Sequence, residues 1–154
     1  MHGPIVYLDF DGVVVTDAQS TTSPRNYLCP SKIALVRDLC DRSGAKVVVS
    51  STWRVSQDCR QSLASAGLPP SYLFADWSTP LTVDDDEDGS IRGLEIDQHV
   101  KCNGIDCFVI LDDMPVLPRQ TPRHVQPDPS VGITKAQIDL AFDLISNPMD
   151  DAHA

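Results

Sequence analysis

Three short apolar runs in the sequence predict buried β-strands. Each run is rich in β-branched or aromatic residues, does not alternate between apolar and polar positions, and stops at an oxygen-bearing side chain; the runs cover residues 4–9, 46–50 and 108–112. Strands that are apolar on both faces are typical of a parallel sheet covered by helices on both sides. Two weaker strand candidates lie at residues 72–75 and 123–126.

Amphipathic segments between the apolar runs predict four helices, over residues 31–43, 56–66, 95–102 and 134–146. Ser31 is the expected N-cap of the first helix, and a glycine follows each of the first three. The alternation of strands and helices predicts an α/β fold: a doubly wound, Rossmann-like parallel sheet flanked by helices, with right-handed crossovers.

Length and charge narrow the classes of protein that fit this pattern. The 154 residues suit one domain, which we expect over residues 1–148 with a disordered tail at 149–154. No apolar run approaches the ~20 residues of a membrane span and no leader precedes the first strand, so we expect a cytoplasmic protein without a membrane partner. A formal net charge of −10 argues against an extended nucleic-acid footprint, so that any nucleic-acid contact would be local.

Oxygen-bearing side chains end the three strong strands. These residues are Asp9, Ser50 and Asp112, and Asp11 and Asp113 follow close behind. Because the carboxyl ends of parallel strands share one edge of the sheet, four carboxylates would meet there. Each pair 4 Å apart would repel by roughly 4 kcal/mol at an effective dielectric constant of 20. A hard divalent cation is therefore expected, and oxygen ligands suit Mg²⁺.

The same residues carry a resemblance to a known family. Three segments resemble motifs I, II and IV of the haloacid dehalogenase (HAD) superfamily: LDFDGVV at 8–14, VVVSS at 47–51 and VILDD at 109–113. Three further details resemble the small capless HAD domains associated with RNA-repair proteins: VVVSSTWR at 47–54, Arg-Gly-x-Glu-Ile at 92–96 and GIT at 132–134. The resemblance spans residues 4–145 and implies a HAD-like core without a large cap.

The resemblance implies a role for each strand-end residue. Asp9 would be the nucleophile that forms an aspartyl-phosphate, and Asp11 would protonate the leaving oxygen and then activate water. Ser50, or its neighbour Ser51, would hydrogen-bond a phosphoryl oxygen. The implied Mg²⁺ ligands are the carboxylates of motifs I and IV: Asp9, Asp11, Asp112 and Asp113.

A cation and backbone donors would complete the phosphate site. Motif III requires a cation that offsets charge on the phosphoryl group; Arg92 is the first choice and Lys101 the alternative. Arg54 is a further candidate phosphate contact, because a guanidinium group can bind phosphate through two hydrogen bonds. An anion nest could form from the backbone N–H groups that follow the first strand, those of Phe10, Asp11 and Gly12.

Several residues near these motifs have simpler explanations. Glu95 is better placed to stabilise a helix start than to bind metal. Trp53 and Trp77 could stack on a base, although packing at the edge of the core is the commoner use of tryptophan. The acidic run at 84–88 is most simply a solvated loop, within a short segment, residues 77–91, that could act as a flap.

The leading hypothesis is a Mg²⁺-dependent phosphomonoesterase that acts on a nucleic-acid terminal phosphate or a nucleotide. A capless site is open, which suits a large substrate. The alternative is a catalytically silent HAD-like module that binds a phosphorylated partner or nucleotide. All five motif residues are present, whereas a silent module would be expected to have lost at least one: Asp9, Asp11, Ser50, Asp112 and Asp113.

Overall fold

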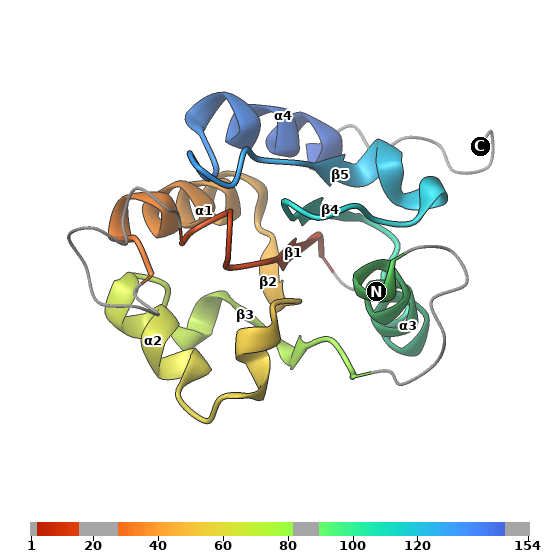
Figure 1. The fold of residues 1–154 in the computed structure, drawn as a ribbon, viewed down its shortest axis with the longest axis horizontal. Coiled ribbons are helices and arrows are strands. Elements are labelled where there is room, and N and C mark those ends of the chain that lie inside the picture. Colours follow the sequence, from red (N-terminus) through yellow and green to blue (C-terminus); the bar gives the residue numbers. More distant parts are fainter. Residues whose placement is uncertain (1–2, 16–27, 82–89, 147–154) are drawn as a thin grey trace.

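The computed structural model describes residues 3–15, 28–81 and 90–146, which form a five-stranded parallel sheet flanked by helices (Figure 1). The strands lie side by side in the order β3-β2-β1-β4-β5, and every pair is parallel. Their bounds are β1 (Ile5–Leu8), β2 (Lys46–Val49), β3 (Leu73–Ser78), β4 (Phe108–Leu111) and β5 (His124–Val125). The prediction of a doubly wound α/β fold is confirmed.

Helices connect the strands as predicted, with shifted ends. The α-helices of the described chain are α1 (Pro30–Ser43), α2 (Cys59–Ala66), α3 (Ile91–Asn103) and α4 (Lys135–Ser146). Three short 3₁₀ helices accompany them: η2 (Thr52–Val55), η3 (Pro70–Tyr72) and η4 (Pro118–Arg123). No helix within the described ranges has the length and apolar character that crossing a membrane requires.

The register of the sheet aligns the predicted site residues. Leu8 at the end of β1 is opposite Val49 of β2 and Leu111 of β4. The next residue of each strand therefore falls at one level. The backbone N–H of Ser50 donates to the Leu8 carbonyl over 3.0 Å, and the N–H of Asp9 donates to the Leu111 carbonyl over 3.0 Å. We call Asp9, Ser50 and Asp112 the strand-end row.

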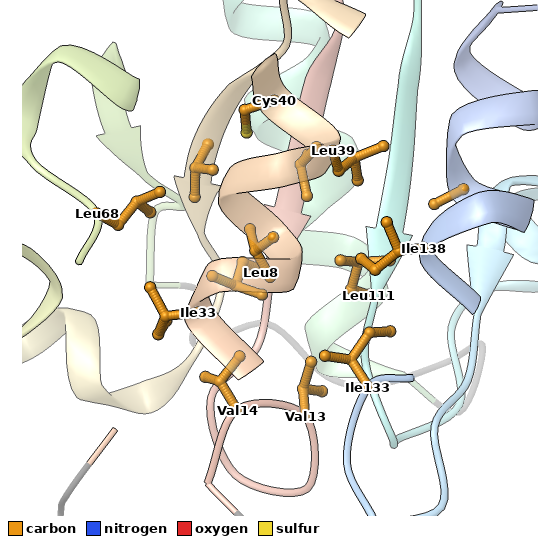
Figure 2. Packing of buried hydrophobic residues seen from close by; sticks show 14 of the residues in the cluster. Leu8, Val13, Val14, Ile33, Leu39, Cys40, Leu68, Leu111, Ile133 and Ile138 are labelled. Carbon is orange, nitrogen blue, oxygen red and sulfur yellow. The ribbon is translucent and has the colours of Figure 1, made fainter. Parts of the chain in front are cut away.

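Two hydrophobic cores, one on each face, hold the sheet. Val6 and Leu8 of β1 belong to a large core with side chains of α1, α2 and α4, whereas Ile5 and Tyr7 belong to a smaller core with α3. Figure 2 shows side chains of this larger core, among them Leu39 of α1, Leu111 of β4 and Ile138 of α4. Burial of each of these aliphatic side chains stabilises the fold by about 1.5–3 kcal/mol. The cores on the two faces therefore hold the strand ends in place.

Two helix starts differ from the predictions because of local capping. Ser31 is not the N-cap of α1; Cys29 takes that position and Pro30, whose ring fixes a helical φ, is the first helical residue. The helix predicted from Ser56 begins instead at Cys59, because the chain first forms η2, and the N–H of Ser56 closes that turn on the Trp53 carbonyl.

Helix α3 begins four residues before the predicted start at Glu95. The Ser90 hydroxyl accepts a 2.9 Å hydrogen bond from the Gly93 N–H and so caps the helix. Gly93 is needed for packing, since a Cβ there would lie 2.6 Å from Oε1 of Gln120. The earlier start places Arg92 in the first turn and Glu95 inside the helix, so Glu95 does not mark the helix start.

Some predictions fall on residues outside the described ranges. These are the tail at 149–154, the acidic run at 84–88 and most of the candidate flap at 77–91.

Candidate active site

Three carboxylates, two of them from the strand-end row, lie together at the carboxyl edge of the sheet. One oxygen from each of Asp9, Asp112 and Asp113 lies within 4.8 Å of the other two. Asp9 and Asp112 are only 3% and 0% exposed, while Asp113 is half-buried. Asp9 follows β1 and the other two follow β4, so the pairing of these strands assembles the group.

Burial and mutual repulsion make these carboxylates hard to ionise together. Burial, followed by the charges of Asp112 and Asp113, raises the pKa of Asp9 to about 8, although Arg92 acts in the opposite direction. Burial also raises the pKa of Asp112, against the lowering effect of Arg92. A cation held by the three oxygens would relieve the repulsion, and an all-oxygen donor set fits a hard ion such as Mg²⁺. The donor chemistry therefore fits the predicted metal.

Arg92 is the cation that the structure places at these carboxylates. Its Nη1 lies 3.0 Å from Oδ1 of Asp9 and 2.7 Å from Oδ2 of Asp112. Within the described residues, its Nε and Nη2 have no hydrogen-bond acceptor. They are therefore the donors that Arg92 has left for a ligand.

Lys101, the alternative cation, is not brought to the site. It lies on α3 about 13 Å along the helix axis from Arg92, at 1.5 Å per residue. Its side chain is 74% exposed and its Nζ contacts Oδ2 of Asp97 at 2.9 Å. Lys101 therefore forms a solvent-exposed i,i+4 ion pair on the surface of α3.

The two serines after β2 have different environments. The hydroxyl of Ser51 accepts a 3.2 Å hydrogen bond from the Trp53 N–H and so caps η2. Ser50 is fully buried, and its hydroxyl has no hydrogen-bond partner among the residues that the structure describes. Buried hydroxyls are usually hydrogen-bonded, so the Ser50 hydroxyl, like that of Thr79, has a donor that no described residue uses. Because a hydroxyl that accepts a hydrogen bond keeps its O–H donor, both serines stay candidates for a contact with a phosphoryl oxygen.

The turn after β1 brings Gly12 against Asp113. Gly12 has a φ of +81°, and a Cβ there would lie 2.4 Å from Oδ2 of Asp113. Only glycine allows this backbone to approach the carboxylate so closely. The Gly12 N–H donates to the Val15 carbonyl over 2.7 Å, so it does not take part in the predicted anion nest. The N–H groups of Phe10 and Asp11 stay candidates.

Asp11 stands apart from the three clustered carboxylates. It is exposed, and its Oδ2 accepts a 3.2 Å hydrogen bond from Nε1 of Trp53. The expectation that its carboxylate joins the metal ligands is not supported, because the chain turns after Asp9 and the indole holds this side chain elsewhere. Sequence reasoning missed the Trp53 contact, which joins positions 42 residues apart.

A family model described as "HAD domain in Swiss Army Knife RNA repair proteins" matches residues 5–138. The chain belongs to this HAD family. The match covers all five strands and therefore the whole strand-end row. No curated protein and no solved structure is significantly similar to the chain. Membership supports a hydrolase-like HAD identity, in a superfamily that generally uses Mg²⁺.

Arg54 is the clearest correction to the site predicted for this HAD domain. Its guanidinium group donates to the backbone carbonyls of Thr79, Ser50, Ser51 and Pro80, and its Nη2 lies 3.0 Å from Oε2 of Glu95. These acceptors use all five N–H donors of an arginine. Arg54 therefore braces the loops after β2 and β3, and its donors are not free to bind phosphate.

Proposed function

We propose that this HAD domain is a Mg²⁺-dependent phosphomonoesterase that acts through an aspartyl-phosphate on Asp9. The observation that carries the proposal is the strand-end row. In this row the buried carboxylate of Asp9 contacts Arg92, and the neighbouring strand ends at Ser50, whose hydroxyl has no partner among the described residues. Transfer of a phosphoryl group to a carboxylate requires a positioned nucleophile and groups that stabilise the charge on the phosphoryl oxygens.

Asp9, Asp112 and Asp113 are the residues that would hold Mg²⁺. When bound, the ion would offset their negative charges, favour ionised Asp9 and polarise a phosphoryl oxygen.

The remaining chemistry belongs to side chains of this chain. An Oδ atom of Asp9 bonds to phosphorus while the bond from phosphorus to the ester oxygen breaks, and Asp11 gives its proton to the leaving oxygen. Water then attacks the same phosphorus, Asp11 accepts its proton, and the bond to Asp9 breaks. Arg92 and Ser50 hold phosphoryl oxygens through both steps. The exposed position of Asp11 suits an acid that must reach both a leaving group and water.

The proposed substrate is a nucleic-acid terminal phosphate or a nucleotide. Support comes from the description of the family, which places such HAD domains in RNA-repair proteins. The net charge of −10 limits this proposal to a terminal contact, since a long polyanion would be repelled. The silent binding module is the weaker candidate because every motif residue is retained.

Phosphate release tests the proposed activity. The substrate panel contains an aryl phosphate, 3′- and 5′-phosphorylated oligonucleotides and nucleoside monophosphates, each with Mg²⁺ or with chelator. We expect Mg²⁺-dependent release from the wild type and a loss of at least about 10³-fold in Asp9→Asn. The matched control is Asp106→Asn, at an exposed carboxylate before β4, which should keep the wild-type rate.

Trapping of the intermediate tests the mechanism more closely. Asp11→Asn removes the proton donor and acceptor while leaving the nucleophile, so covalent phosphate should accumulate on Asp9 and be found by mass spectrometry of acid-quenched protein. Release at the wild-type rate by Asp9→Asn would contradict the proposed function, and so would a wild type that releases no phosphate from any member of the panel.

A further inference from the structure

A groove of about 590 Å³ is lined in part by Arg92. Its wall comes from four separate parts of the chain: η2, the residues after β3, the first turns of α3 and the residues after β4. Its volume lies within the range of ordinary ligand pockets, about 300–1,000 Å³. Arg92 lines the groove and its Nη1 also contacts Asp9, so the groove and the strand-end row share this arginine.

Exposed apolar side chains converge on this groove. Val55, Leu81, Ile91 and Met114 line it and are 65%, 68%, 46% and 53% exposed. Among the described residues, the large apolar side chains with comparable exposure elsewhere are Val131 and Leu140. Each of the four comes from a different part of the chain, so no single amphipathic helix explains them. Exposed apolar surface gathered in one concave place marks a binding site.

The charged groups in the groove wall are already neutralised by protein partners. Arg54 and Glu95 form a buried ion pair, with side chains 3% and 7% exposed, and the donors of Arg54 are fully used. Arg92 faces the carboxylates of the row. Among the described residues that line the groove, no other cation is present to meet a second phosphate.

We propose that the groove binds the organic group of the phosphate ester, and that this group is uncharged and largely apolar. The proposal rests on the proposed function, since the phosphate is placed at Arg92 and the ester oxygen leads into the groove. It narrows the substrate to a monophosphate whose adjoining group buries apolar surface, as the faces of a nucleobase or another ring do. A second phosphate next to the first would lie against apolar side chains, so a substrate with such a phosphate should bind less well.

Binding of phosphonates tests this proposal without turnover, because their carbon–phosphorus bond is not an ester. Methyl-, propyl- and hexylphosphonate are titrated into the wild type with Mg²⁺ by calorimetry. We expect the affinity to rise by about twofold to fourfold for each methylene that the groove buries. A phosphonate of similar length that ends in a carboxylate should lose most of the gain, since the groove offers that charge no partner.

Variants of the groove locate the effect. In the wild type, the affinity for hexylphosphonate should exceed that for methylphosphonate. Leu81→Ser and Val55→Ser should each reduce this increase in affinity by about fivefold or more. Leu140→Ser is the matched control, because Leu140 is 49% exposed on α4 and does not line the groove, and it should keep the wild-type gain.

The outcomes separate this proposal from the proposed function. Equal affinity for all three phosphonates, or the same loss of gain in Leu140→Ser as in the groove variants, would overturn the groove proposal and leave the phosphatase standing. A wild type that binds none of the phosphonates, methylphosphonate included, would overturn both.

Discussion

Two arginines at the carboxyl edge of the sheet, Arg54 and Arg92, have opposite surroundings. Arg54 gives its donors to four backbone carbonyls and to Glu95, whereas Nη1 of Arg92 contacts both Asp9 and Asp112. Their side chains are 3% and 18% exposed. An arginine that backbone carbonyls surround holds loops together, and one that bridges two strand-end carboxylates is placed for chemistry.

The pKa values of the two guanidinium groups are also shifted in opposite directions. Burial lowers the pKa of Arg54 although Glu95 opposes it. Burial acts in the same direction on Arg92, but the charges of Asp9 and Asp112 outweigh it and raise its pKa. The two carboxylates beside Arg92 therefore outweigh its burial, whereas burial outweighs the single carboxylate beside Arg54.

The largest effect that we predict from this comparison is on stability. Arg54→Met leaves the Glu95 carboxylate buried without its cation, so the free energy of unfolding should fall by about 3–5 kcal/mol in denaturant titrations. The double variant Arg54→Met/Glu95→Leu should recover part of that loss, because the uncompensated charge is gone. A loss below about 1 kcal/mol in the single variant would contradict a bracing role for Arg54.

Arg92→Gln should affect turnover instead. Removal of a charge that faces the phosphoryl group should lower kcat/KM by about 10²- to 10³-fold, equivalent to about 2.7–4 kcal/mol. Lys101→Gln is the matched control on the same helix: its exposed side chain should leave kcat/KM unchanged. If Lys101→Gln were the slower variant, the motif III cation would be Lys101 after all.

A smaller effect is expected at Trp53. Trp53→Phe removes the Nε1–H donor to Asp11 but keeps an aromatic ring against Phe10, whose centroid lies 5.3 Å away. A hydrogen bond to a charged group contributes about 1.5–3 kcal/mol, so we expect about a tenfold or larger fall in kcat for alkyl phosphates. Aryl phosphates should slow less, since their leaving oxygen needs less help from an acid.

Trp77→Phe is the control for that leaving-group test. Trp77 is half-buried and packs against Arg60, away from Asp11. The same slowing of alkyl and aryl esters in Trp53→Phe would indicate that the indole only supports the fold and does not position the acid.

The strand-end row could be predicted because it depends on local patterns. An apolar run predicts a buried strand, a polar residue ends it, and the ends of parallel strands meet at one edge. Asp9, Ser50 and Asp112 needed no knowledge of distant contacts, and the register places all three at one level. The sequence left Arg92 and Lys101 as alternatives for the cation, since both precede β4, and their contacts in the fold distinguish them.

The features that were missed depend on pairs distant in the sequence. Nothing near Arg54 shows that Glu95 and the carbonyl of Thr79 will surround it, so a free arginine and a buried one look the same in the sequence. The contact between Trp53 and Asp11 is hidden for the same reason. The early start of α3 was missed because Gly93, a poor helix former, is retained for its close packing on Gln120.

The register of β2, β1 and β4 also couples binding to the folding of the whole sheet. The strand-end row exists only when these three strands are paired, so an unfolded chain has no comparable site for a ligand. A ligand at 100 times its Kd would then stabilise the native state by about 2.7 kcal/mol. The added protection should appear in hydrogen exchange along the whole length of these central strands, including amides that the ligand does not touch. Occupancy of the site would then govern how often the sheet opens.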